Sequence, residues 1–170
     1  MVFPGSEIPK WFSHQCMGDE VKIMEPFSHL CNDWIGIAVC VVFCPLLRCP
    51  IYQGTVQFKL RANGKDMSFV GKKGRCSAYY IGDATFASSD HIWLLYLLPQ
   101  LIWEEDRKSL WECDANGFRK IGIKIDRLNL SLVKKCGLRV VYNKDIEDLN
   151  SNVVQHSNNS IIPYEGLKES

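Results

Sequence analysis

The sequence predicts an all-β domain, a two-layer antiparallel β-sandwich with little helix. Its apolar residues occur in short runs that either alternate with polar residues or are continuous over eight or nine positions, and turn residues separate these runs. No long apolar stripe at helical spacing competes with this pattern. The chain has 170 residues, of which 46% are hydrophobic and 23% charged, as is typical of one globular domain with its own core.

The N-terminal half contains a predicted short strand, a central strand and a β-hairpin. We expect a strand at Val21–Met24 and another at Ile35–Phe43 (IGIAVCVVF), which is apolar on both faces, as expected at the centre of two packed layers. In VQFKLRANGKDMSF, apolar residues alternate on both sides of the pair Asn63-Gly64. This pair readily adopts the positive φ angles of a type I′ turn, so the segment is a predicted β-hairpin.

The C-terminal half contributes another central strand and two strands with one more polar face. His91–Leu98 (HIWLLYLL) is apolar on both faces, whereas apolar residues alternate along Ile121–Ile125 and Leu138–Tyr142. About seven or eight strands in a chain of this length fit a sandwich with either jelly-roll or Ig-like connections.

Three segments lie outside these predicted strands. Gly71–Asp90 (GKKGRCSAYYIGDATFASSD) is punctuated by glycine and serine and is a predicted long surface loop. Leu101–Asn116 (LIWEEDRKSLWECDAN) joins two strands and is expected to contain one or two helical turns. Polarity rises beyond Tyr142, so we divide the chain into a sandwich at residues 1–148 and a polar, flexible C-terminal tail at residues 149–170.

Eight cysteines raise the question of disulfide bonds. The first residues, MVFPGSEIPKWF, lack the basic and apolar segments of a signal peptide, and the longest apolar stretches fall far short of the roughly 18 residues that cross a bilayer. We therefore expect reduced thiols, no membrane contact, and a location in the cytoplasm, extending to the nucleus. The cysteines are Cys16, Cys31, Cys40, Cys44, Cys49, Cys76, Cys113 and Cys136.

The cysteines and histidines form no recognisable metal or catalytic motif. Cys40, Cys44 and Cys49 could be combined with His29 or His91 as zinc ligands, but their spacing is poor and the chain contains no CxxC pair. None of the four histidines lies beside an elbow or oxyanion-loop motif. We expect no metal site and no catalytic residue.

The acidic and glycine-rich segments likewise predict no enzyme. Glu104, Glu105 and Asp106 could supply the paired carboxylates of a glycosidase, but neighbouring acids in a connection more often form a solvated face. The basic turn GKKGR at residues 71–75 lacks the pattern and the helix of a phosphate-binding loop. We therefore expect no cofactor.

Charge is balanced over the chain but not locally. The net charge is +1, so no chain-wide field attracts nucleic acid or an anionic membrane. Between Lys59 and Arg75, however, the chain carries six basic residues and one acidic residue. Alternating Lys and Arg on a hairpin are most often its solvated face, and as a binding patch they suit an acidic protein partner better than nucleic acid.

Four segments together resemble one known family. They are, in order, PGSEIPKWF (4–12), LCNDWIGIAVCVVF (30–43), SSDHIWLLYL (88–97) and VKKCGLRVVYNKD (133–145). They are similar to motifs of the C-JID, the C-terminal jelly-roll/Ig-like domain that follows the leucine-rich repeats of plant TIR-NB-LRR disease resistance receptors. The resemblance covers the chain from Val2 to about Asp148.

This resemblance implies a ligand-recognition module of an intracellular immune receptor. The partners it implies are a pathogen effector protein and the adjacent leucine-rich repeats of the same receptor, with effector binding leading to receptor oligomerisation and defence signalling. The NAD hydrolase activity of such receptors belongs to their TIR domain, which is absent from this chain. The rival reading is a free-standing carbohydrate-binding β-sandwich module, in which exposed aromatic rings stack on sugars.

The family motifs fall on predicted core strands and crossings, so we assign six of their residues to packing and not to ligand contact: Trp11, Trp34, Trp93, Gly36, Gly137 and Cys136. Partner contacts are expected in the two long connections, because aromatic residues and Arg dominate interface hot spots. Either tryptophan of the second connection could instead cap the core. The predicted protein-binding residues are Lys72, Lys73, Arg75, Tyr79, Tyr80, Trp103 and Trp111.

Overall fold

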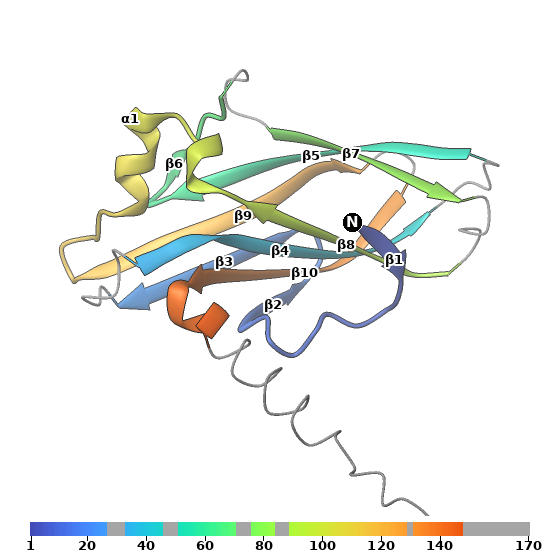
Figure 1. The fold of residues 1–170 in the computed structure, drawn as a ribbon, viewed down its shortest axis with the longest axis horizontal. Coiled ribbons are helices and arrows are strands. Elements are labelled where there is room, and N and C mark those ends of the chain that lie inside the picture. Colours follow the sequence, from blue (N-terminus) through green and yellow to red (C-terminus); the bar gives the residue numbers. More distant parts are fainter. Residues whose placement is uncertain (27–32, 46–50, 71–75, 84–88, 129–130, 148–170) are drawn as a thin grey trace, which may run out of the picture.

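The fold is a sandwich of two antiparallel β-sheets, seen in a computed structural model that describes residues 1–26, 33–45, 51–70, 76–83, 89–128 and 131–147. Side chains are described for these residues except 51–55, 76–83, 127–128 and 131. Figure 1 shows the two layers, with the short helix α1 at one end of the sandwich beside the β6 hairpin. This architecture confirms the predicted all-β sandwich.

The first sheet has the strand order β1-β8-β4-β10-β2. Its strands are β1 (Val2–Pro4), β2 (His14–Met17), β4 (Trp34–Pro45), β8 (His91–Leu97) and β10 (Ser131–Tyr142). All of its neighbouring strands are antiparallel. The two strands predicted to be central, β4 and β8, are hydrogen-bonded neighbours, and β4 is the middle strand of this sheet.

The second sheet has the order β3-β9-β5-β6, and β7 also pairs with β5. Its strands are β3 (Glu20–Pro26), β5 (Ile51–Ala62), β6 (Lys65–Asp66), β7 (Cys76–Asp83) and β9 (Phe118–Leu128). Neighbouring strands in this sheet are antiparallel as well. The chain changes sheet between β2 and β3, β3 and β4, β4 and β5, β7 and β8, β8 and β9, and β9 and β10, so the two sheets are linked by repeated crossings.

The main core lies between the two sheets. It is built from the alternating inward residues of the strands, which the period-two pattern predicted. The second sheet supplies Val56, Phe58, Leu60, Ile121, Ile123 and Ile125, and the first sheet supplies Val39, Val41, Phe43, Trp93, Leu97 and Leu138.

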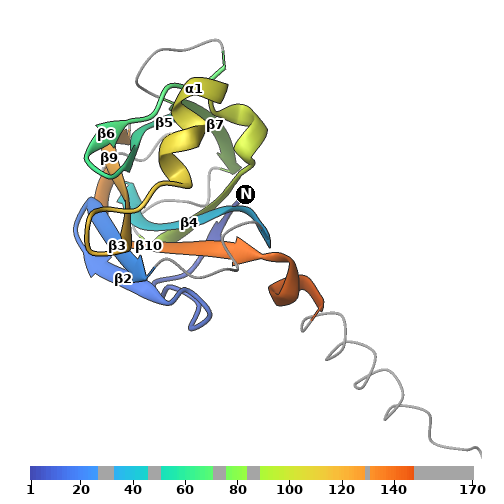
Figure 2. The same ribbon diagram turned by 90° about the vertical axis from the view of Figure 1, so that its left-hand side faces the viewer.

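A second cluster covers the outer face of the first sheet, which explains why β4 is apolar on both faces. Ile8 and Phe12, from the segment between β1 and β2, pack against Ala38, Cys40 and Val42 of β4 and against Ile92. The close approach depends on Gly137 of β10, where a Cβ would lie 2.9 Å from Cγ2 of Ile8. The N-terminal segment thus acts as a third layer over this part of the sheet (Figure 2).

The predicted hairpin is confirmed. Asn63 and Gly64 have φ angles of 49° and 85° and join β5 to β6, as a type I′ turn requires. The second strand is shorter than expected, since β6 ends at Asp66, but Met67 and Phe69 remain buried.

The prediction of a long surface loop at Gly71–Asp90 is wrong for residues 76–83. Cys76–Asp83 forms β7, which pairs with β5 from Ile51↔Asp83 to Phe58↔Cys76. The strand forms because β5 presents an unpaired backbone edge there that β7 satisfies, a long-range requirement that local turn residues do not reveal.

The other connections are closer to expectation. Leu101–Asn116 contains α1 (Glu104–Arg107) and a 3-10 turn at Lys108–Leu110, and a further 3-10 turn at Pro99–Leu101 precedes them. Residues 143–147 form a helical turn after β10. The predicted tail at residues 149–170 lies outside the described residues. Among the described helices, none is long and apolar enough to cross a membrane.

Candidate protein-binding surface

The connection that contains Trp103 is held against the end of the β6 hairpin by backbone hydrogen bonds. Phe69 and Ile102 form an isolated antiparallel bridge. On either side of it, the N–H of Val70 donates to the carbonyl of Leu101 at 2.9 Å and the N–H of Trp103 donates to the carbonyl of Ser68 at 2.9 Å. This short ladder makes the connection part of the scaffold.

Alternation along this ladder separates buried from exposed side chains. Phe69 and Ile102 point into the core and are 3% and 1% exposed. Their neighbours point outward, as successive residues of extended chains do. We call the four exposed side chains here the apolar patch: Val70, Leu98, Leu101 and Trp103, which are 62%, 45%, 44% and 50% exposed.

Hydrogen bonds link two of the patch residues through their backbone and fix the ring of Trp103. The N–H of Leu101 donates to the carbonyl of Leu98 at 3.0 Å. The indole Nε1 of Trp103 donates to the carbonyl of Phe69 at 2.8 Å, which orients the ring without burying it. Several exposed apolar side chains on neighbouring, hydrogen-bonded segments are a usual mark of a protein contact surface.

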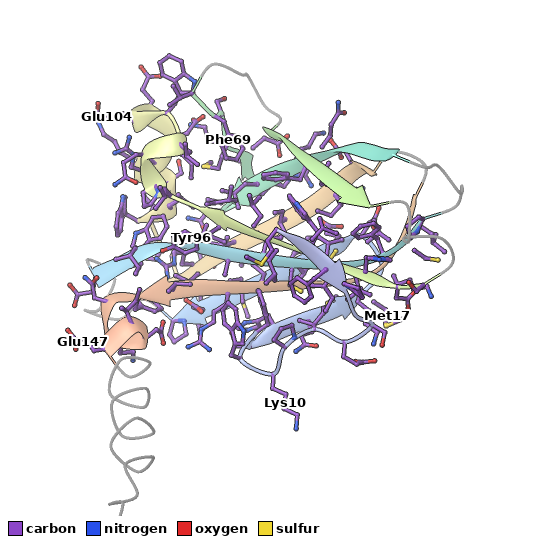
Figure 3. The ribbon with its side chains drawn as sticks, turned by 45° about the vertical axis from the view of Figure 1, so that its right-hand side comes forward. Lys10, Met17, Phe69, Tyr96, Glu104 and Glu147 are labelled. Carbon is purple, nitrogen blue, oxygen red and sulfur yellow. The ribbon has the colours of Figure 1, made fainter. Side chains whose placement is uncertain are left out.

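Asp106 attaches α1 to the hairpin beneath the patch. Its carboxylate accepts the N–H of Ser68 at 2.7 Å and the ammonium of Lys65 at 2.8 Å. The hydrogen bond from Lys65 holds the pKa of Asp106 below its usual range, and the same bond raises the pKa of Lys65. Asp106 is therefore a buried structural anion, whereas Glu104, which Figure 3 labels on α1, and Glu105 are exposed.

The two tryptophans predicted as binding residues have different surroundings. Trp103 is half exposed in the apolar patch. Trp111 is partly buried against the core, with its ring centroid 4.9 Å from that of the buried Trp34. Trp111 thus lies where a residue that caps the core would lie, which is the alternative that the sequence left open.

Of the remaining predicted binding residues, the structure describes the backbone of two. Tyr79 and Tyr80 belong to β7, opposite Thr55 and Gly54, so their backbone is part of the sheet and not of a loop. Lys72, Lys73 and Arg75 lie outside the described residues. The chain enters their segment from Val70 in the apolar patch and leaves it into β7.

Three patch residues were not predicted as partner contacts. The sequence places Leu98 at the end of a predicted buried strand. For Val70 and Leu101, no sequence pattern indicates that these aliphatic side chains are exposed and not part of the core. Pro99 was the available clue, because proline after an apolar run ends a strand and turns the chain.

A buried polar network elsewhere is structural in character. The guanidinium of Arg119, 3% exposed, donates to Glu25 Oε2 at 3.1 Å and to the Tyr142 hydroxyl at 3.0 Å. That hydroxyl donates to the same Glu25 oxygen at 3.0 Å. Burial, with the Glu25 charge adding to it, raises the pKa of Tyr142 to about 12, so the phenol stays protonated. The network joins β3, β9 and β10.

The thiols with described side chains are unpaired. Cys40 and Cys136 are buried, and burial raises the pKa of each to about 12, which disfavours the thiolate that nucleophiles and metal ligands require. Within the described part of the chain, no three His, Cys, Asp or Glu side chains form a group suited to a metal ion.

The residues predicted to pack do so with one exception. Trp34, Trp93 and Cys136 are buried, and Gly36 and Gly137 lie under close contacts. The prediction is wrong for Trp11, which is 47% exposed and lies over the guanidinium of Arg139, 5.7 Å from the ring centroid.

Comparison with known proteins identifies relatives of this chain. The family described as C-JID domain matches residues 3–147. Two relatives are from Arabidopsis thaliana: Disease resistance protein RPP2B is 24% identical over 87% of this chain and 14% of its own length, and Protein SUPPRESSOR OF npr1-1, CONSTITUTIVE 1 is 28% identical over 84% of this chain and 9% of its own length. The chain therefore spans a small fraction of these relatives.

A solved structure also matches weakly. It is the CBM36-1 domain of a multidomain xylanase from the hindgut metagenome of Trinervitermes trinervoides, 10% identical, with 73% of each chain covered and a TM-score of 0.31. That score is too low to indicate a common fold.

Proposed function

The chain belongs to the C-JID domain family, and on this basis we propose that it is the ligand-recognition module of a plant intracellular immune receptor. In this proposal it binds a pathogen effector protein together with leucine-rich repeats of the same receptor, and binding promotes receptor oligomerisation and defence signalling. The naming of one relative as a disease resistance protein supports this role.

The observation that carries the proposal is the apolar patch. It presents an aromatic anchor, Trp103, among aliphatic side chains on a connection held by the hairpin, and the segment with Lys72, Lys73 and Arg75 begins beside it at Val70. Hot spots of protein interfaces combine a rigid aromatic anchor with surrounding residues that exclude water. The effector surface that fits is apolar at its centre and basic where it meets Glu104 and Glu105.

We further propose that this chain is not catalytic. Glu104, Glu105 and Asp106 do not form a pair of catalytic carboxylates. Asp106 is ion-paired with Lys65, whereas Glu104 and Glu105 face solvent. Any NAD hydrolase activity would reside in a TIR domain elsewhere in the receptor. The cytoplasm and the nucleus are the proposed locations, as for the effectors that such receptors meet inside the cell.

The carbohydrate-binding alternative is not favoured by the exposed tryptophans. Sugar binding needs an aromatic face free for stacking. Trp11 has the Arg139 guanidinium over its ring, and the indole N–H of Trp103 is already used in a hydrogen bond to the carbonyl of Phe69.

The test uses the full-length receptor, expressed in leaves together with a library of pathogen effectors until one triggers cell death. We expect Trp103→Ala and Leu101→Ser to reduce that response and effector co-precipitation about tenfold, the loss of one hot spot, with receptor abundance unchanged. Leu132→Ser, at an equally exposed leucine on β10, is the matched control and should respond normally.

The proposal fails if both patch variants respond as the unmodified receptor does. It also fails if the Leu132→Ser control loses the response to the same extent, because the effect would then follow from any exposed apolar residue.

A further inference from the structure

The outer face of the second sheet contains a hollow centred on Gly122. The pairing of three strands places Lys22 of β3, Gly122 of β9 and Arg61 of β5 in one row across the sheet. Gly122 has no side chain, and the stem of Lys22 lies beside it, with Cγ 3.2 Å from where a Cβ of residue 122 would be. The hollow has a volume of about 430 Å³ and is lined by Lys22, Ile23, Met24, Arg61, Gly64, Lys120, Ile121 and Gly122.

Three of these lining residues are cations and none is an acid. The side chains of Lys22, Arg61 and Lys120 are 70%, 41% and 56% exposed, so a ligand can reach them. The floor of the hollow is strand backbone, because Ile23 and Ile121 direct their side chains into the core. The hollow is therefore basic at its rim and closed below.

Acids outside the hollow hold these cations in place. Glu20 lies 3.1 Å from the Lys22 ammonium, and Asp66 lies 2.5 Å from Nε of Arg61. Asp114 lies 3.1 Å from the Lys120 ammonium and is itself fixed by the N–H groups of Asn116 and Phe118, both at 3.0 Å.

These pairs leave the cations able to bind a ligand. Exposed ion pairs contribute only about 0–1 kcal/mol each, so they are readily shared. A lysine ammonium has three donors and a guanidinium has five, more than one acid occupies. An anion in the hollow would thus share each of the three cations with the acid that it already contacts.

The wall of the hollow also selects the kind of anion. Met24, 59% exposed, adds an apolar surface beside the cations. A carboxylate on a short aliphatic stem matches this combination. None of the described residues that line the hollow is aromatic, so they offer no stacking surface of the kind that single-stranded nucleic acid uses.

We propose that this hollow is a docking site for an acidic segment of a protein partner, with an Asp or Glu carboxylate seated over Gly122 between Lys22, Arg61 and Lys120. The hollow shares no residue with the apolar patch, so this site is separate from the proposed effector contact.

The test measures binding of fluorescein-labelled hexaglutamate to the 170-residue chain by fluorescence anisotropy, at an ionic strength of about 50 mM, where screening is weak. The combined variant Lys22→Glu with Lys120→Glu should weaken binding at least about tenfold, by about 1.4 kcal/mol. The matched control is Lys10→Glu with Lys144→Glu, which changes the net charge equally at two exposed lysines outside the hollow (Figure 3 shows Lys10).

A second variant fills the hollow and keeps every charge. At Gly122 the nearest neighbour of an added Cβ is Cγ of Lys22 at 3.2 Å, the stem of a flexible side chain, so Gly122→Val should fold, which thermal unfolding would check. We expect it to weaken hexaglutamate binding about tenfold as well.

Three outcomes would overturn the proposal. They are an equal loss of binding in the Lys10/Lys144 control, unchanged binding by folded Gly122→Val, and tighter binding of a labelled ten-nucleotide oligothymidylate than of hexaglutamate under the same conditions.

Discussion

Asn63 shows how one side chain joins segments that are distant in sequence. Its Nδ2 donates to the carbonyls of Ser109 at 3.2 Å and Glu112 at 2.9 Å, and its Oδ1 accepts the N–H of Lys120 at 2.9 Å. The positive φ of the turn directs the side chain to these groups. Asn63 therefore couples the hairpin to the connection that follows α1 and to β9.

Gly36 is required by a close approach of two strands in the first sheet. A Cβ at Gly36 would lie 2.4 Å from Cζ of Tyr96 and 2.8 Å from the backbone oxygen of Leu97. A strand carbonyl cannot move aside as a side chain can, so we predict that Gly36→Ala lowers the free energy of unfolding by about 1–3 kcal/mol.

Urea unfolding followed by tryptophan fluorescence measures this loss. Gly122→Ala is the control, because its new methyl comes within 3.2 Å of the flexible stem of Lys22 but meets backbone only at an ordinary 3.5 Å, at the oxygen of Val21. An equal loss in the two variants would show that strand glycines matter here through chain entropy and not through contact with Tyr96 and Leu97.

At the scale of elements, the segment between β1 and β2 acts as a cover for the first sheet. Phe12 is 2% exposed, whereas its neighbour Trp11 is 47% exposed, although the two rings are in contact with centroids 4.1 Å apart. Lys135 of β10 further anchors the segment through Glu7 at 2.7 Å. Sheet coverage therefore depends on a few apolar side chains in an irregular stretch.

We predict that Phe12→Ala lowers the free energy of unfolding by about 3–5 kcal/mol, since it leaves a cavity over β4 and β10. Trp11→Ala should cost only about 1 kcal/mol, the contribution of a surface cation–π contact with Arg139. Chemical unfolding of both variants would test the contrast, and a larger loss for Trp11→Ala would contradict the burial described here.

The elements that the sequence predicted correctly are those with a local signal. Asn63-Gly64 specifies its turn through its own φ angles, and β4 and β8 are long apolar runs. The edge strands β1 and β2, of three and four residues, were not predicted, because such short strands exist only through their partners. β7 has eight residues and was missed because its pairing with β5 is a long-range contact.

For the whole molecule, we predict that two buried thiols and the partly buried phenol of Tyr142 lower stability as the pH becomes alkaline. Burial raises the pKa of Cys40 and Cys136 from 9.0, and that of Tyr142 from 10.0, to about 12. Each folded-state pKa exceeds its unfolded value, so the contribution is complete below the unfolded pKa and is lost as pH rises through the folded one. Stability should fall between about pH 9 and 12, by up to about 1.4 kcal/mol per pH unit for each group.

Urea midpoints at about pH 8 and about pH 10.5, with a reductant present, would measure this slope. The double variant Cys40→Ala with Cys136→Ala should be less stable but should show a flatter dependence on pH. An unchanged slope in that variant would assign the alkaline loss to other groups.

The candidate surface was predictable only in part. Trp103 was found because exposed connections and aromatic residues favour partner contacts, and it lies in the apolar patch. The sequence did not predict the other patch residues, Val70, Leu98 and Leu101, because residue type alone does not show whether an aliphatic side chain is exposed or buried. Their exposure follows from the bridge between Phe69 and Ile102, two residues that are distant in sequence.

The sequence by itself determined the all-β class, the hairpin at Asn63-Gly64 and the central strands, because side-chain alternation and turn φ angles are local properties. It also carried the motifs of the C-JID family. Only the tertiary structure decided that Phe12 is buried beside an exposed Trp11, and that Gly122 opens a hollow between Lys22 and Arg61. Both depend on the register and packing of segments far apart in the chain, which local patterns do not encode.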